Sequence, residues 1–159
     1  MKRLKFILML LWNSPLTIIG IIHALIFTIF GWYTFKQVYD ISLVWQVNFA
    51  KFPKKLIHLW DNHNSYSMGN VIVIKKNLKI SEATLLHELE HVRQSMILGI
   101  FYPIFYYLFS FIIRISLNKS HHYFSNPFEV EARRVAKQTI DIEGILEKAK
   151  RKGKNENVD

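Results

Sequence analysis

The residues that could do chemistry in this 159-residue chain are two histidines four positions apart, with a glutamate beside the first. His87, Glu88 and His91 form the pattern H-E-x-x-H, and on a helix both imidazoles would lie on one face, one turn apart, where they can bind one metal ion. Zinc suits this donor set, and two imidazoles with one carboxylate leave a coordination position open for water. Glu88 is expected to take a proton from that water. The spacing therefore predicts hydrolytic zinc chemistry.

A third ligand must come from another part of the chain, and the start of a second helix supplies two candidates. Asn126 is a predicted N-cap and Pro127 suits the first helical position, so this helix start is the best marked in the sequence. Glu129 and Glu131 follow closely, and either carboxylate could reach the metal. Each could equally be an exposed carboxylate that the helix dipole favours. The residues alone leave the third ligand open.

The two motifs together resemble the gluzincin clan of zinc metallopeptidases, in which a Glu on a following helix completes the H-E-x-x-H site. The segment from Glu129 to Arg133 is similar to the E-x-x-A-D segment of that clan. Aligning Ala132 with it makes Glu129 the third ligand and Glu131 the fallback. Arg133 stands where the clan usually has Asp, so the resemblance does not imply the partner that this Asp would supply.

The closest resemblance is to small uncharacterised bacterial membrane proteins that share H-E-x-x-H-V-R-Q and N-P-F-E-x-E-A. These motifs are residues 87–94 and 126–132 here, and the resemblance covers residues 68–132. A more distant resemblance is to the membrane-embedded heat-shock peptidases and the prenyl-protein peptidases. The resemblance implies zinc as the cofactor, a peptide or protein substrate, and a location in the bacterial cytoplasmic membrane.

Other polar residues near the motifs are weaker candidates. His122 and Tyr123 precede the ligand helix, and one of them could stabilise the transition state by polarising a scissile carbonyl, although such a cluster is more often an exposed loop. Arg93 and Gln94 follow the first motif by less than a turn. We expect these two residues to support the ligands or the fold and not to be catalytic.

The elements that would position this chemistry are a short sheet and two helices. Alternating apolar residues predict a half-buried strand over residues 38–47, and four β-branched residues predict a buried strand over 71–74. The second strand could instead lie at a sheet edge and bind substrate by strand addition. Ser81 is a predicted N-cap for a helix over 83–98, and the ligand helix would run from Asn126 toward Leu146. The expected fold is α+β, a minimal zincin core.

An apolar stretch without Asp, Glu, Lys or Arg runs from residue 6 to residue 35, directly after a basic start. It is long enough to span a bilayer and lacks the small-residue cleavage site of a secretory signal. We therefore predict an uncleaved anchor over residues 1–36. Because proline disrupts the helical hydrogen-bond ladder, the spanning helix is expected to begin near Pro15.

A second apolar segment covers residues 96–117 and separates the two motifs. A single crossing would place His91 and Glu129 on opposite sides of about 30 Å of hydrocarbon, and two crossings would need about forty apolar residues. The segment is therefore expected to dip into the membrane and return near Pro103, to lie in the interface, or to form a buried core helix. All three alternatives remain open.

The overall composition limits the remaining possibilities. The chain has no cysteine, which excludes disulfides and thiolate metal sites, and its net charge is +9. This charge suits membrane lipid, and no nucleic-acid motif accompanies it, so nucleic acid is not an expected partner. We expect a catalytic domain over residues 37–147, a basic tail over 148–159, and peptide hydrolysis at or near a membrane. The alternative is a non-catalytic membrane protein with a structural or sensing zinc site.

Overall fold

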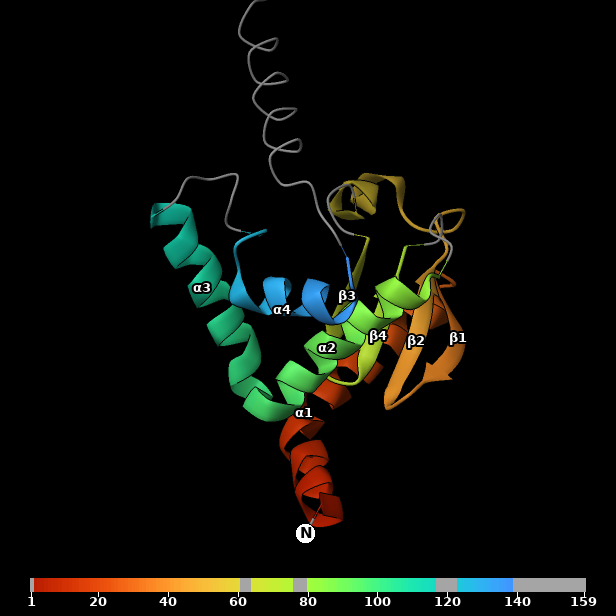
Figure 1. The fold of residues 1–159 in the computed structure, drawn as a ribbon. Coiled ribbons are helices and arrows are strands. Elements are labelled where there is room, and N and C mark those ends of the chain that lie inside the picture. Colours follow the sequence, from red (N-terminus) through yellow and green to blue (C-terminus); the bar gives the residue numbers. More distant parts are fainter. Residues whose placement is uncertain (1, 61–63, 76–79, 117–122, 139–159) are drawn as a thin grey trace, which may run out of the picture.

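A computed structural model describes residues 2–60, 64–75, 80–116 and 123–138. The fold combines helices with a small four-stranded sheet, as the sequence predicts at this coarse level (Figure 1). The elements in chain order are α1 (Lys2–Ile29), β1 (Tyr33–Tyr39), β2 (Ser42–Val47), the 3-10 helix η1 (Lys54–Trp60), β3 (Ser65–Met68), β4 (Val71–Ile74), α2 (Glu82–Leu98), the 3-10 helix η2 (Gly99–Phe101), α3 (Tyr102–Ser116) and α4 (Pro127–Val135).

The sheet has the order β1-β2-β4-β3, with β2 and β4 parallel and the outer pairs antiparallel. All four residues of β4 are fully buried, because Val71 and Val73 pack with α1 on one face while Ile72 and Ile74 pack with α2 on the other. The core-strand prediction for residues 71–74 is therefore confirmed. The edge position beside it belongs to β3.

The single strand predicted over residues 38–47 is wrong. The chain turns at Asp40, whose φ of 50° lies in the left-handed region, and the stretch divides between β1 and β2 of an antiparallel hairpin. The prediction of a half-buried strand also fails, because β2 pairs on both sides and contributes Val44 to one core and Val47 to the other. An alternating pattern alone does not show where a hairpin turns.

Helix α1 is continuous from Lys2 to Ile29, so the predicted start near Pro15 is wrong. Pro15 cannot donate a backbone hydrogen bond to the carbonyl of Leu11, four residues earlier. The hydroxyl of Ser14 donates to that carbonyl instead, at 2.7 Å, which keeps it paired within the helix. The proline is thereby tolerated inside α1.

Helix α1 packs along the sheet. The side chain of Asn13 donates to that of Asn70 in the β3–β4 turn at 2.8 Å, and Thr17 donates to the same oxygen at 2.9 Å. Gly69 makes the approach possible, because a Cβ there would collide with the backbone of Thr17. Strand β1 begins at Tyr33, so it includes the last residues of the segment predicted as an anchor.

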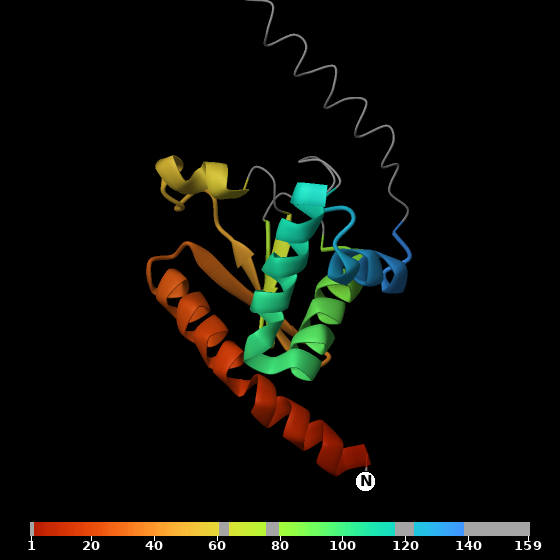
Figure 2. The ribbon, with the colours of Figure 1, turned by 90° about the vertical axis from the view of Figure 1, so that its left-hand side faces the viewer.

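Helix α2 begins where the sequence predicts, with the Ser81 side chain accepting a hydrogen bond from Thr84 N. It ends at Gly99, whose φ of 58° and ψ of −137° favour glycine, and the chain then folds back into α3. The return therefore lies at Gly99, and Pro103 is already inside α3. Figures 1 and 2 both show α2 and α3 as two arms that diverge from this turn.

None of the described residues of α3 is buried, so the core-helix alternative for the second apolar segment is wrong. Two helical stretches, Arg3–Ile29 and Glu82–Ser116, are long and apolar enough to cross a membrane, although the second bends at Gly99. This gives weak support to a membrane association, as predicted. Because the chain folds back at Gly99, His91 before the bend and Glu129 after it can lie close together, as a shared site requires.

Helix α4 confirms the predicted start, because the Asn126 side chain accepts a hydrogen bond from Phe128 N at 3.0 Å and Pro127 opens the helix. Helix α4 ends at Val135, so the predicted extension toward Leu146 is wrong for residues 136–138. Lys137 has a φ of 52°, which departs from the helical region. Residues 139–146 and the predicted basic tail lie outside the described residues.

Candidate metal centre

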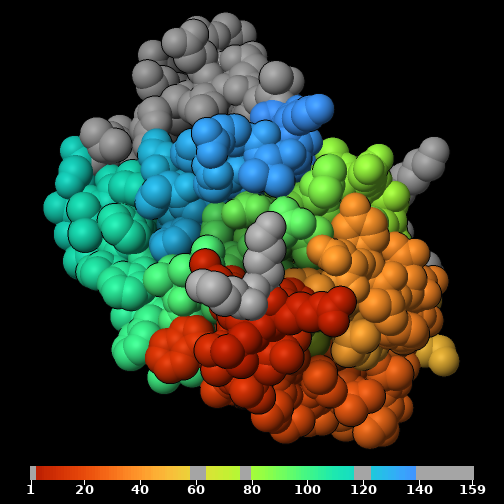
Figure 3. Space-filling view, turned by 60° about the horizontal axis from the view of Figure 1, so that its bottom comes forward, coloured from red at the N-terminus to blue at the C-terminus, as the bar shows by residue number. Residues whose placement is uncertain are grey.

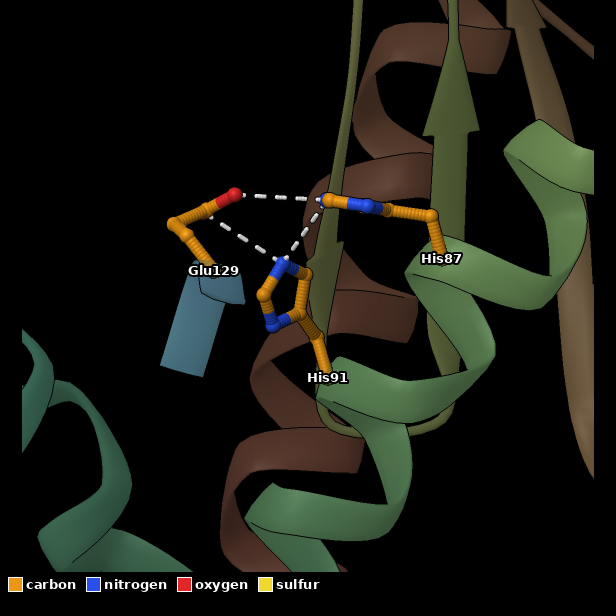
Figure 4. Close-up of side chains that lie close together, drawn as sticks. All are labelled: His87, His91 and Glu129. Atoms are coloured by element: carbon orange, nitrogen blue, oxygen red, sulfur yellow. Dashed lines mark hydrogen bonds and ion pairs between the residues drawn. The ribbon is translucent and has the colours of Figure 1, made fainter. Parts of the chain in front are cut away.

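Helix α2 and the first turn of α4 bring three potential ligands together (Figure 4). His87 and His91 lie one turn apart on the buried face of α2, and Glu129 reaches them from α4. The two Nε2 atoms are 3.2 Å apart, and the Glu129 carboxylate oxygens lie 3.3 Å from His87 Nε2 and 3.4 Å from His91 Nε2. All three side chains are buried, and the group could hold a metal ion.

The spacing of these donor atoms fits zinc. In a tetrahedral site with bonds of about 2.0–2.1 Å, two ligand atoms lie about 3.3–3.4 Å apart. The two imidazole nitrogens are 3.2 Å apart, and each has one oxygen of the Glu129 carboxylate near it, Oε2 at 3.3 Å from His87 and Oε1 at 3.4 Å from His91. A cation between His87 and His91 also resolves the contact of their facing nitrogens, because two neutral imidazoles cannot both point a lone pair at each other favourably. The donor set and its spacing therefore suit a small divalent cation with one open position.

The orientation of His91 is fixed by two neighbours on its other nitrogen. Nδ1 lies 2.9 Å from Gln94 Oε1 and 3.0 Å from the hydroxyl of Tyr102. An N–H at Nδ1 that donates to Gln94 leaves Nε2 unprotonated and directed at the cluster, as a metal ligand must be. Gln94 also donates to the backbone carbonyl of Phe128 at 3.1 Å, so one amide joins the ligand on α2 to the ligand helix α4.

The Glu129 carboxylate has a hydrogen-bond donor on α3 and a cationic neighbour on α4. Tyr106, on α3, donates to Oε1 at 2.7 Å, and the guanidinium of Arg133 lies 3.8 Å from Oε2. Burial alone would raise the pKa of Glu129, but its hydrogen bonds with His87 and His91 keep the pKa below the usual value. Glu129 is therefore a carboxylate near neutral pH, which is the form that binds a cation. Arg133, at the position where the clan usually has Asp, is thus a cationic neighbour of the ligand.

Glu88 lies beside this cluster and is also buried. The hydroxyl of Ser65, on the edge strand β3, donates to Glu88 Oε1 at 2.6 Å. Oε2 has no hydrogen-bond partner among the described residues, although a buried carboxylate oxygen ordinarily has one. This arrangement fixes the side chain through one oxygen and leaves the other free to interact with a small molecule.

The other residues singled out in the sequence lie in different places. Glu131 lies apart from the cluster on the partly exposed side of α4 and pairs with Arg134 at 2.6 Å. Arg93 lies at the surface, 3.7 Å from Asp40. Tyr123 lies next to Glu129, and burial together with that carboxylate raises the pKa of Tyr123, so its hydroxyl stays protonated. His122 lies outside the described residues.

Three residues that touch the candidate site were not predicted from the sequence, namely Ser65, Tyr102 and Tyr106. The two tyrosines had a recognisable signal. Together with Ser110 they recur every four residues in an apolar segment, which places them on one face of α3. Ser65 had no comparable signal, because its contact with Glu88 depends on where β3 lies relative to α2.

No protein family, curated protein or solved structure matches this chain. The gluzincin assignment therefore remains a prediction from the motifs. The His87, His91 and Glu129 cluster stands independently, because it follows from the geometry of α2 and α4.

Proposed function

We propose that the protein is a zinc-dependent peptidase that hydrolyses peptide bonds at or near a membrane. The observation that carries the proposal is the buried Glu88 carboxylate beside the His87, His91 and Glu129 cluster, with one oxygen fixed by Ser65 and the other without a partner among the described residues. A structural metal site has no use for such a carboxylate, whereas a hydrolytic site needs a base there.

His87, His91 and Glu129 would hold the zinc ion. When bound, zinc would polarise a peptide carbonyl and lower the pKa of a water molecule in its open position toward ~7. Glu88 is placed to accept a proton from the attacking water and to pass it to the amine that leaves when the C–N bond breaks. The Tyr123 hydroxyl, protonated and next to Glu129, is placed to donate a hydrogen bond to the oxyanion that develops on the carbonyl.

A peptide substrate is also supported by the position of β3. This strand pairs with β4 on one side, and no described strand pairs with its other side. Ser65 at its start contacts Glu88, so an extended peptide that added to β3 would pass close to the base. Backbone pairing of this kind would position the scissile bond without a deep pocket for one side chain.

The test compares the wild type with Glu88→Gln, using Glu131→Gln as a matched control on α4. We expect Glu88→Gln to retain zinc and to lose at least ~100-fold in the hydrolysis of casein or a peptide mixture, because the base is gone while the ligands remain. Glu131→Gln should keep both the zinc and the hydrolytic activity. Zinc binding with no hydrolysis in the wild type would contradict the proposal and favour the non-catalytic zinc protein instead.

A further inference from the structure

Three polar side chains of helix α3 are directed inward, and most of its large apolar side chains are directed outward. Tyr102, Tyr106 and Ser110 all make hydrogen bonds, to His91 on α2, to Glu129 in the first turn of α4 and to its N-cap Asn126. Arg114 in the last turn is exposed, and six large hydrophobic side chains face outward and are between 46% and 71% exposed: Ile104, Tyr107, Leu108, Phe111, Ile112 and Ile115. This polarity is the reverse of that of a helix that packs on a water-soluble core.

Helix α1 also exposes apolar side chains, although its side toward the sheet is mixed and places Ala24 and Ile21 in the core. Its side toward the sheet contains Asn13, Thr17 and His23, which bond to Asn70 or Tyr66. Its outward side is formed by exposed apolar residues from end to end: Leu8, Leu11, Ile18, Ile22, Ile26 and Ile29. Polar groups that are paired inside the protein and apolar groups that face outward suit an environment without water.

The two apolar surfaces are continuous. The ring of Trp12 on α1 lies 6.2 Å from that of Phe101 in η2, centroid to centroid, and a side chain at Gly99 would collide with Trp12. Figure 3 shows α1 against the α2–α3 turn on one face of the molecule. The ion pair between Arg93 and Asp40 marks a different, water-exposed part of the surface.

An apolar surface of this extent is unfavourable in water, and it also bears on the metal centre. Helix α3 has no buried residue of its own, and a 15-residue helix is marginally stable in water without packing. Its inward contacts include the hydrogen bond between the Tyr102 hydroxyl and His91 Nδ1 and the one that Tyr106 donates to Glu129. Whatever covers the outer side of α3 therefore also holds two hydroxyls against the metal ligands.

We propose that phospholipid acyl chains cover the outward sides of α1 and α3, and that this contact holds Tyr102 and Tyr106 on the ligands, so that the bilayer supports metal affinity. Lipid is favoured over a second copy of the chain because the apolar surface follows the whole length of α1, as a lipid-facing helix requires. The inference rests on the metal cluster alone and is independent of peptide hydrolysis.

The lipid contact is tested with spin labels at single introduced cysteines, which is clean because the chain has no cysteine of its own. The full chain is reconstituted into vesicles of phosphatidylcholine and phosphatidylglycerol. Labels at Leu108, Ile112 and Ile22 should be accessible to oxygen and protected from a water-soluble nickel complex. A label at Val38, an apolar residue that is also exposed but lies on β1, should show the opposite. Nickel access at Leu108 and Ile112, or their burial between two chains, would overturn the proposal.

The coupling to the metal is tested by zinc affinity, measured in the same vesicles by competition with a chromophoric chelator. Leu108→Asn/Ile112→Asn should weaken both vesicle association and zinc affinity, the latter by about tenfold, as expected when groups that support a ligand are displaced. Tyr106→Phe should weaken zinc affinity alone, and Val38→Asn should change neither. Wild-type zinc affinity in a double variant that no longer associates with vesicles would overturn the coupling.

Discussion

Helices α2 and α3 are joined at Gly99 but are stabilised in opposite ways. Helix α2 directs Leu85, Leu89 and Val92 into the core beneath the sheet and exposes Arg93. Helix α3 directs Tyr102 and Tyr106 inward and exposes most of its large apolar side chains. The first arrangement is that of a protein in water, and the second is that of a protein in lipid.

The candidate metal centre lies where these two arrangements meet. Helix α2 supplies His87, His91 and Glu88 from its buried face, while the hydroxyls of α3 contact His91 and Glu129. Helix α2 should therefore determine whether the site exists, and α3 should adjust how well it holds the metal. Substitutions of matched type on the two helices can separate these roles.

The largest difference is expected for core stability. Leu89 on α2 is buried, and Leu89→Ala should lower the free energy of unfolding by about 2–5 kcal/mol through lost burial and a cavity. Leu108→Ala on α3 should lower it by less than about 0.5 kcal/mol, because an exposed side chain leaves no cavity. Denaturant unfolding in detergent, followed by circular dichroism, measures both. Equal losses would mean that α3 is packed against the protein as firmly as α2.

A smaller effect is expected where α2 orients its own ligand. Gln94→Leu should weaken zinc affinity by about tenfold, because Gln94 sets the protonation of His91 and joins it to α4. Arg93→Leu, the neighbouring change at the surface, should leave the affinity unchanged. Competition with a chelator measures the zinc affinity of each variant relative to the wild type. An equal loss in both variants would indicate a general effect on α2 and not a role for the amide.

The smallest effect is expected at the start of α2. Ser81→Ala removes the side chain that caps Thr84 N and should cost about 1 kcal/mol of stability. Ser81→Asp retains an acceptor and should restore most of the loss. Zinc affinity should stay at the wild-type value in both, since Ser81 lies more than one turn before the first candidate ligand, His87. A large loss of zinc affinity would show that the N-terminal turn of α2 affects the metal site.

The sequence was most informative where one short-range signal fixed the structure. The four β-branched residues from Val71 identified a core strand, and Ser81 and Asn126 marked two helix starts correctly. These signals work because capping and burial of a strand on both faces depend on the residues themselves.

The errors arose where a partner elsewhere in the chain decided the outcome. Pro15 is tolerated because Ser14 bonds the carbonyl of Leu11, and the strand over 38–47 divides because Asp40 adopts a left-handed turn. Likewise, the contact of Ser65 with Glu88 depends on strand order and not on any local pattern.

The most direct test of the central claim is the metal content of the purified full chain, measured by elemental analysis after purification with metal present. We predict about one zinc per chain in the wild type and in Glu131→Gln, and little or none in His91→Ala and Glu129→Gln, because each of these two changes removes a ligand from the cluster. A wild-type protein without zinc, or a His91→Ala variant that keeps it, would contradict the account.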